Sequence, residues 1–177
     1  MPPSEFSDLF RSYYPYFIQK AERSLSLLHD SHYPRLAMEA AAVGSFIHYY
    51  VAARNFIIQN NGAYLIDFDY CCCDLPLTDL MRLIKRGLKQ GEKEWEKLDA
   101  MLKGYQQFRP LTAEETKVLI ALLTFPQKFW RISHRYFCGE LAHDEDFCIK
   151  KLRLAMEESL REDQWLPMLK EKTEEAH

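Results

Sequence analysis

The chain has 177 residues, of which 47% are apolar and 14% aromatic, a composition that excludes a disordered protein and suits one domain with a sizeable core. Its formal net charge of −3 argues against nucleic acid as the main partner, because a phosphate backbone favours a clustered positive surface. No run reaches the roughly 18–20 apolar residues of a membrane span. The N-terminus lacks a basic segment followed by an apolar run, so we expect no signal peptide and a cytoplasmic protein.

The first part of the chain is expected to be helical. Apolar residues recur at helical spacing over residues 5–29, with Ser4 as a plausible N-cap. Pro15 lies inside this segment and either kinks the helix or splits it. An alanine-rich stretch over residues 34–43 predicts a second helix.

A β-hairpin is expected next. Two short apolar runs, residues 56–58 and 63–66, flank the sequence Gln-Asn-Asn-Gly at 59–62. An Asn-Gly pair between apolar runs is a strong hairpin signal, because both residues tolerate the positive φ of a tight turn. The hairpin would separate a loop beginning at His48 from a loop containing Asp67.

The remainder is predicted to be helical from Thr78 onward. Thr112 and Glu115 have the spacing of a capping box, and Pro126 is expected to open a further helix. We expect a disordered polar tail over Glu171–His177. The fold class is therefore mainly α with a small β-hairpin, an α+β chain with one domain over residues 1–177.

Five cysteines are present, an odd number, and three of them are contiguous. Adjacent cysteines do not form a C-x-x-C zinc motif, and their side chains alternate in direction along an extended backbone. We expect small buried or half-buried thiols, with metal binding or a structural disulfide as the alternatives. The residues are Cys71, Cys72, Cys73, Cys138 and Cys148.

The segment from His48 to Asn55, followed by Asp67 and Phe68, has the spacing of a phosphoryl-transfer site. Kinase-type sites use H-x-D-x-x-x-x-N and then an Asp-Phe pair, in which the first Asp accepts the proton of the attacking hydroxyl. Here Tyr50 occupies the place of that proton acceptor. The spacing is preserved, whereas the catalytic group is changed.

Asn55 and Asp67 are the candidate magnesium ligands. Hard oxygen ligands hold Mg²⁺, and an amide carbonyl and a carboxylate at the two ends of a hairpin could converge on one ion. Asp69 offers a second carboxylate, which strand alternation would place on the same side as Asp67. It could take a second ion or brace the loop.

Two further residues have structural interpretations. His48 is expected to hydrogen-bond the loop and thereby fix its shape, because either ring nitrogen can satisfy a backbone group. Asp79 is either an ordinary charge at a helix N-terminus or an anchor that reaches back to the loop. Motif matches carry false positives, so a coincidental loop in a helical protein is a further alternative.

The segments FIH (46–48) and AARNFI (52–57), YLIDFDYC (64–71) and DLPLTDL (74–80) resemble the bacterial spore-coat CotS family. This family is kinase-like and related to aminoglycoside and choline phosphotransferases. The stretches 109–115 and 125–131 are similar to its helical tail. The resemblance implies the C-terminal lobe of that fold, Mg and ATP as cofactors, Asn55 and Asp67 as metal ligands, Asp79 as the loop anchor, and a mother-cell or spore-coat location.

The chain departs from the family in two places. Tyr50 falls on the catalytic-base position, and a phenol is a poorer proton acceptor at neutral pH than a carboxylate. The family's N-terminal lobe clamps ATP with a strand-borne Lys and a loop over the phosphates. Ahead of His48 this sequence has one Lys (Lys20), one Gly (Gly44) and no glycine-rich loop. We therefore expect that this chain alone binds neither Mg nor ATP.

Three functional hypotheses follow, and whether the chain is an enzyme is left open. The first is a degenerate or truncated kinase-like spore-coat protein, inactive as an isolated chain, with a structural, assembly or binding role. Its partners would be spore-coat proteins, or a second copy of itself through an exposed surface facing the N-lobe position. The second is a small-molecule phosphotransferase that uses ATP and Mg with a separate N-lobe. The third is an unrelated helical interaction protein.

Overall fold

The structure is a computed structural model that describes residues 3–59, 62–88, 93–141 and 144–175, with side chains to residue 170. Its helices are α1 (Glu5–His29), α2 (Tyr33–Ala42), α3 (Leu77–Gly87), α4 (Glu94–Gln106), α5 (Ala113–Thr124), α6 (Gln127–Phe137) and α7 (Glu145–Glu175). Its strands are β1 (Phe46–Ile47), β2 (Phe56–Gln59), β3 (Gly62–Leu65) and β4 (Cys72–Cys73), with a short 3₁₀ helix η1 (Ala53–Asn55) before β2.

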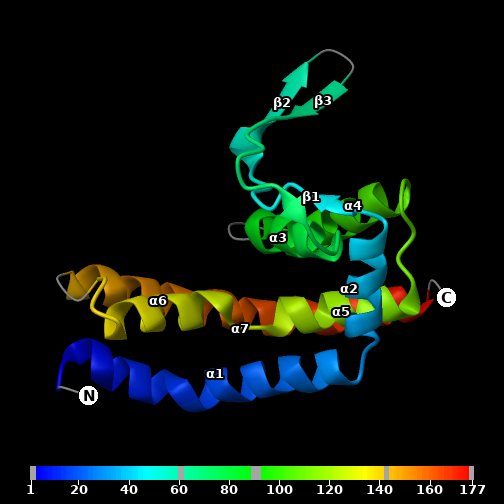
Figure 1. Cartoon of the computed structure of the whole chain (residues 1–177). Helices are drawn as coiled ribbons and strands as arrows, with labels where there is room; N and C mark the ends of the chain where they lie inside the picture. The colour runs from blue at the N-terminus through cyan, green and yellow to red at the C-terminus, as the bar shows by residue number, and fades with distance from the viewer. Residues whose placement is uncertain (1–2, 60–61, 89–92, 142–143, 176–177) are drawn as a thin grey trace.

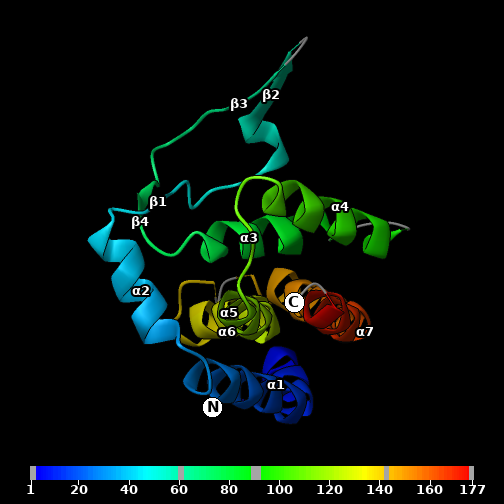
Figure 2. The ribbon, with the colours of Figure 1, turned by 90° about the vertical axis from the view of Figure 1, so that its right-hand side faces the viewer.

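The helices lie in stacked layers beneath the hairpin (Figure 1). Helix α1 covers one side of a layer formed by α5, α6 and α7, and α3 with α4 covers the other side. Helix α2 crosses the edge of the layers and leads into β1 (Figure 2). The β2–β3 hairpin projects from the far side of α3, so the loops that it connects lie directly over that helix.

Helix α5 is the centre of the packing, because it contacts α1, α2, α3 and α7. Its start is fixed by the expected capping box: the Thr112 side chain accepts from the Glu115 amide at 3.1 Å, and the Glu115 carboxylate accepts from the Thr112 amide at 3.0 Å. On α1, Ser24 Oγ donates to the Ala121 carbonyl of α5 at 2.8 Å. This bond joins the two layers at a buried position.

The expectations for α1 are confirmed in part. Ser4 is its N-cap, and the hydroxyl accepts a hydrogen bond from the Ser7 amide at 3.2 Å. Pro15 lies inside a continuous helix, so the chain is not split there. The fully buried rings of Phe6 and Phe17 attach this helix to α6 and α7, with Phe17 stacked on Phe129 at 4.0 Å between ring centroids.

The predicted hairpin is present. Strands β2 and β3 are antiparallel, with Phe56 opposite Leu65 and Gln59 opposite Gly62. The Asn60–Asn61 part of the expected turn lies outside the described residues. A second two-stranded sheet, which was not expected, pairs β1 with β4 and ties the start of the His48 loop to the segment that precedes α3.

The expectation of buried or half-buried cysteines is wrong for four of the five. Cys71, Cys72, Cys73 and Cys138 are exposed, and Cys148 is buried in the α1–α6–α7 core; all five are free thiols. For Cys72 and Cys73 the reason is topological. Strand β4 pairs with β1 alone, so no layer covers it.

The end of the chain also differs from expectation. Helix α7 continues to Glu175, so the segment expected to form a disordered tail from Glu171 is helical to that point. Residues 176–177 lie outside the described residues. Among the helices of the described part of the chain, none has the length and hydropathy needed to cross a bilayer.

The central position of α5 yields a stability prediction. Leu119 is fully buried on this helix, within the core shared by α2, α3, α4, α5 and α7. Leu119→Ala should lower the free energy of unfolding by roughly 2–5 kcal/mol, through lost transfer energy and a cavity. Leu25→Ala is the matched control, because Leu25 is 64% exposed, and it should change stability by at most about 0.5 kcal/mol. Denaturant unfolding measures both, and equal effects would contradict the central role of α5.

Candidate functional site

The residues from His48 to Asn55 form a loop between β1 and β2 that lies over α3 (Figure 2). His48 is buried and joins this loop to the segment after the hairpin. Its Nε2 atom lies 2.9 Å from the Ile66 carbonyl oxygen, and its Nδ1 atom accepts from the Tyr50 amide at 3.2 Å. These two contacts fit a neutral ring with the proton on Nε2. The imidazole thus organises the loop instead of facing a substrate.

Asp79 contacts the loop from the first turn of α3. Its carboxylate accepts from the His48 amide at 2.7 Å and from the Tyr49 amide at 2.9 Å. Tyr49 has a φ of 63°, a left-handed conformation that costs energy for a residue with a large side chain. Of the two interpretations of Asp79, the geometry is that of the anchor.

Asn55 and Asp67 meet across the base of the hairpin. The Asn55 Nδ2 atom lies 3.3 Å from an Asp67 carboxylate oxygen and donates to the Tyr50 carbonyl at 3.0 Å. Asn55 is buried, whereas Asp67 is exposed and has a φ of 70°. The Ile66 amide also donates to the Asn55 carbonyl at 2.9 Å, which fixes the two segments relative to one another.

An amide oxygen and a carboxylate are ligand types of Mg²⁺, which is commonly bound by one or two carboxylates together with substrate phosphates and water. Here Asn55 presents its amide nitrogen, a donor, to Asp67. Within the described ranges, no group of three or more His, Cys, Asp or Glu side chains gathers as a metal site. A cation here would be held by Asn55 and Asp67 and would depend on oxygens from a phosphate or water. When bound, it would neutralise phosphate charge.

The alternation of side chains along a strand does not determine the position of Asp69. Strand β3 ends at Leu65, and the left-handed Asp67 breaks the alternation of side chains before Asp69, which lies in an exposed turn. The strand argument for a shared side is therefore wrong. The carboxylate of Asp69 makes no contact with Asn55 or Asp67 among the hydrogen bonds of the described residues.

Tyr50, at the proton-acceptor position, is surrounded by cations. The Arg54 guanidinium donates to its hydroxyl oxygen, and the guanidinium carbons of Arg54 and Arg86 lie 4.9 and 4.7 Å from its ring centroid. Tyr70 packs at 5.7 Å between ring centroids. The phenol is thus held in place by positive charge.

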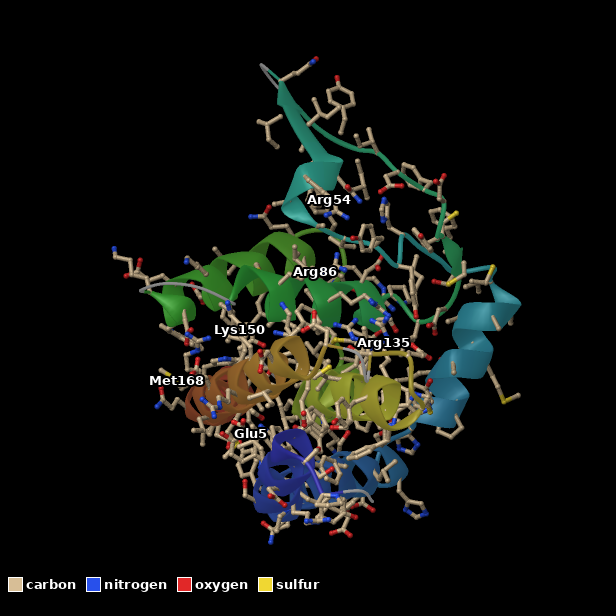
Figure 3. The ribbon with its side chains drawn as sticks, turned by 90° about the vertical axis from the view of Figure 1, so that its left-hand side faces the viewer. Glu5, Arg54, Arg86, Arg135, Lys150 and Met168 are labelled. Carbon is tan, nitrogen blue, oxygen red and sulfur yellow. The ribbon has the colours of Figure 1, made fainter. Side chains whose placement is uncertain are left out.

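The arginines around Tyr50 were not identified as site residues from the sequence. Figure 3 shows Arg54 at the base of the hairpin and Arg86 beneath it on α3. Burial lowers the pKa of Arg86, and Arg82, Arg54 and Arg131 lower it further, while Tyr50 opposes this shift. A usable signal existed: Arg82 and Arg86 are four residues apart, which places them on one face of the predicted helix.

These helices, with the hairpin over α3, have the predicted fold of a lobe of an aminoglycoside phosphotransferase. A solved aminoglycoside phosphotransferase from Alicyclobacillus acidocaldarius subsp. acidocaldarius DSM 446 matches with a TM-score of 0.83 at 21% identity, covering 97% of this chain and 51% of that one. At this level of identity, the likeness establishes the fold and no activity.

The chain belongs to the family described as "Spore coat putative kinase YutH", whose profile matches residues 1–169. Spore coat protein S of Bacillus subtilis (strain 168) is 28% identical over 138 residues, which are 77% of this chain and 39% of that protein. The resemblance to spore-coat kinase-like proteins is confirmed, and an unrelated helical protein is ruled out. The chain spans about half the length of the solved phosphotransferase and less of protein S.

The anchoring by Asp79 can be tested by amide exchange. Asp79→Ala leaves the His48 and Tyr49 amides without their acceptor, a loss of roughly 1–3 kcal/mol. Hydrogen exchange of these two amides should accelerate about tenfold or more. Asp8→Ala is the control, because Asp8 is another first-turn acid but contacts the exposed Arg11 side chain. Unchanged exchange at residues 48 and 49 in the Asp79 variant would show that the loop holds its shape without the carboxylate.

Proposed function

We propose that this chain is a kinase-like lobe that has a structural, assembly or binding role in the spore coat. It does not itself transfer phosphate. The observation that carries the proposal is Tyr50. At the position where a kinase-type site has its proton acceptor, the chain has a phenol whose oxygen receives a hydrogen bond from Arg54. An oxygen already engaged by a cationic donor is a poor base for an incoming hydroxyl.

Two of the nearby carboxylates are engaged elsewhere. Asp79 accepts from two loop amides, and Asp67 lies against the Asn55 amide. Neither is free to replace the missing base without giving up the contact that shapes the loop. The spore-coat setting is supported by the family of the chain and by its likeness to spore coat protein S.

The alternative is a small-molecule phosphotransferase that uses Mg and ATP with an N-terminal lobe. The specific observation in its favour is the Asn55–Asp67 pair, which retains the residue types of a magnesium site on two adjoining segments, with the Asn55 amide nitrogen facing the carboxylate. Phosphoryl transfer relies more on positioning and charge than on a base. Both candidate functions are compatible with a folded site. They differ in whether the protein transfers phosphate from ATP.

Release of inorganic phosphate from Mg-ATP separates the candidates. We expect wild type, Tyr50→Phe and Asp67→Asn to give the same background rate, because no proton acceptor serves the site. Tyr50→Phe is a matched change, since it removes the hydroxyl and keeps the ring on which Arg54 and Arg86 lie. Phosphate release by wild type that disappears in Asp67→Asn would overturn the proposal and favour the transferase.

Calorimetry with Mg-ATP provides a second readout. We expect no heat of binding from the 177-residue chain or from Tyr50→Asp, because residues 1–47 contain no glycine-rich loop. Micromolar binding by wild type would contradict a chain that is inactive for lack of a nucleotide site. Binding that appears with Tyr50→Asp alone would place the defect at this residue.

Self-association stays a prediction for the hairpin and β1, where several apolar side chains are exposed. Ile58 is 75% exposed, Tyr64 and Phe46 are also exposed, and the Phe46 and Phe68 rings stack at 6.2 Å. Exposed apolar patches mark interaction surfaces more often than chance. Light scattering over a dilution series should show association, and a monomer at all concentrations would count against it.

A further inference from the structure

A group of arginines gathers on the side of the Tyr50 loop that faces α3. Arg82 and Arg86 come from α3 and Arg131 from α6, and all three line a cavity of about 130 Å³ bounded by α3, α6 and α7. Arg54 extends the group at the hairpin base, next to Arg86 (Figure 3). Guanidinium groups crowded in this way repel one another, so their grouping requires an explanation.

The charges of the cavity are only partly balanced. Its two lysines face its two glutamates: Lys85 lies 3.7 Å from Glu162, and Lys128 pairs with Glu158. Burial lowers the pKa of Lys85, while Glu162 raises it. Each acidic group of the cavity thus lies at ion-pair distance from a lysine, while Glu158 Oε2 is buried without a hydrogen-bond partner among the described residues.

The arginines have no such partner. Within the described residues, no carboxylate forms an ion pair with Arg54, Arg82, Arg86 or Arg131. The Nε atom of Arg82 is buried without a hydrogen-bond partner, while its guanidinium carbon lies 3.8 Å from the Tyr49 ring centroid. A buried donor left unsatisfied costs free energy, and an anion in the cavity would remove that cost.

We propose that Arg82, Arg86 and Arg131 bind a phosphate group of a small-molecule ligand, with Arg54 adding positive charge beside Arg86 at the Tyr50 ring. Phosphate suits the site because planar guanidinium groups donate paired hydrogen bonds to its oxygens. The proposal deepens the proposed binding role and rests on it, since it names the chemistry that the lobe would recognise. An acidic surface elsewhere, with a net charge of −3 for the chain, disfavours a long polyanion.

The position of the cavity favours a site for a ligand other than the nucleotide. We call this the acceptor-side site. Its walls come from α3, α6 and α7, whereas Asn55 and Asp67, the candidate ligands of a nucleotide-bound magnesium, lie at the hairpin base. A phosphate here would therefore belong to a ligand other than the nucleotide. The same chemistry could come from the terminal phosphate of ATP, so the experiment must separate the two sources.

The test titrates inorganic phosphate without magnesium or nucleotide, at constant ionic strength, and follows binding by phosphorus NMR. Arg131→Gln is the main variant, because Arg131 is exposed and its loss should leave the fold intact. Arg82→Gln is the second. Each removes a charge-assisted contact worth roughly 1.5–3 kcal/mol, so each should weaken phosphate binding about tenfold or more.

Arg23→Gln is the matched control, since it removes the same charge from an exposed position on α1, at the opposite side of the layers. It should bind phosphate as wild type does, and so should Asp67→Asn. Equal weakening in Arg23→Gln and Arg131→Gln would reduce the effect to general electrostatics and overturn the proposal, as would an absence of saturable binding by wild type.

A second arm titrates Mg-ATP in the same variants. If Arg131→Gln weakens ATP binding and Asp67→Asn removes the binding of both ligands, then the arginines hold the nucleotide's phosphates and the acceptor-side site is overturned. Phosphate binding that depends on Arg131 and survives Asp67→Asn supports it. Because the first arm contains no nucleotide, its result does not depend on whether the lobe turns over ATP.

Discussion

Two backbone amides that point at one carboxylate determine the geometry of this site. Asp79 accepts from His48 and Tyr49 at 2.7 and 2.9 Å, and it does so from a helix that is packed into the main core. The loop is therefore fixed to a helix whose apolar face is buried in the larger core. This contact offsets the energetic cost of the left-handed conformation of Tyr49. Without it, the path of the residues that follow Tyr49 would change.

Beyond the Asp79 contact, hydrogen bonds connect the loop to the hairpin. His48 bridges to the Ile66 carbonyl, and Asn55 bridges to Tyr50 and Asp67. Both side chains are buried, and both have their hydrogen bonds within the site. The polar network is thus a structural unit, and its shape can persist when the proton acceptor is replaced.

Much of this could be predicted from the sequence, because the relevant signals are local. The capping box at Thr112, the cap at Ser4 and the hairpin each depend on a few neighbouring residues. The proximity of Asn55 and Asp67 follows from the hairpin between them. Contacts between distant segments could not be predicted in this way. The pairing of β1 with β4, and hence the exposure of Cys72 and Cys73, has no local sequence signal.

Asp69 and the arginines show two other limits. The alternation rule fails at Asp69 because a single left-handed residue, Asp67, precedes it. Aspartate can adopt that conformation, so the sequence gives no signal of it. The arginines come from η1, α3 and α6, so only the packing of helices reveals that they meet. Their helical spacing on α3 shows a shared face, but not what the face is turned toward.

The tyrosine and the arginine group are physically connected. A carboxylate at position 50 would lie against Arg54 and Arg86, where Tyr50 now lies, and it would offset part of their positive charge. The phenol offers these guanidinium groups a ring face and one oxygen, both weaker partners than an ionised carboxylate. The change that removes a proton acceptor therefore leaves the adjoining cavity more positive. The proposed anion site would draw on the positive charge that remains around Tyr50.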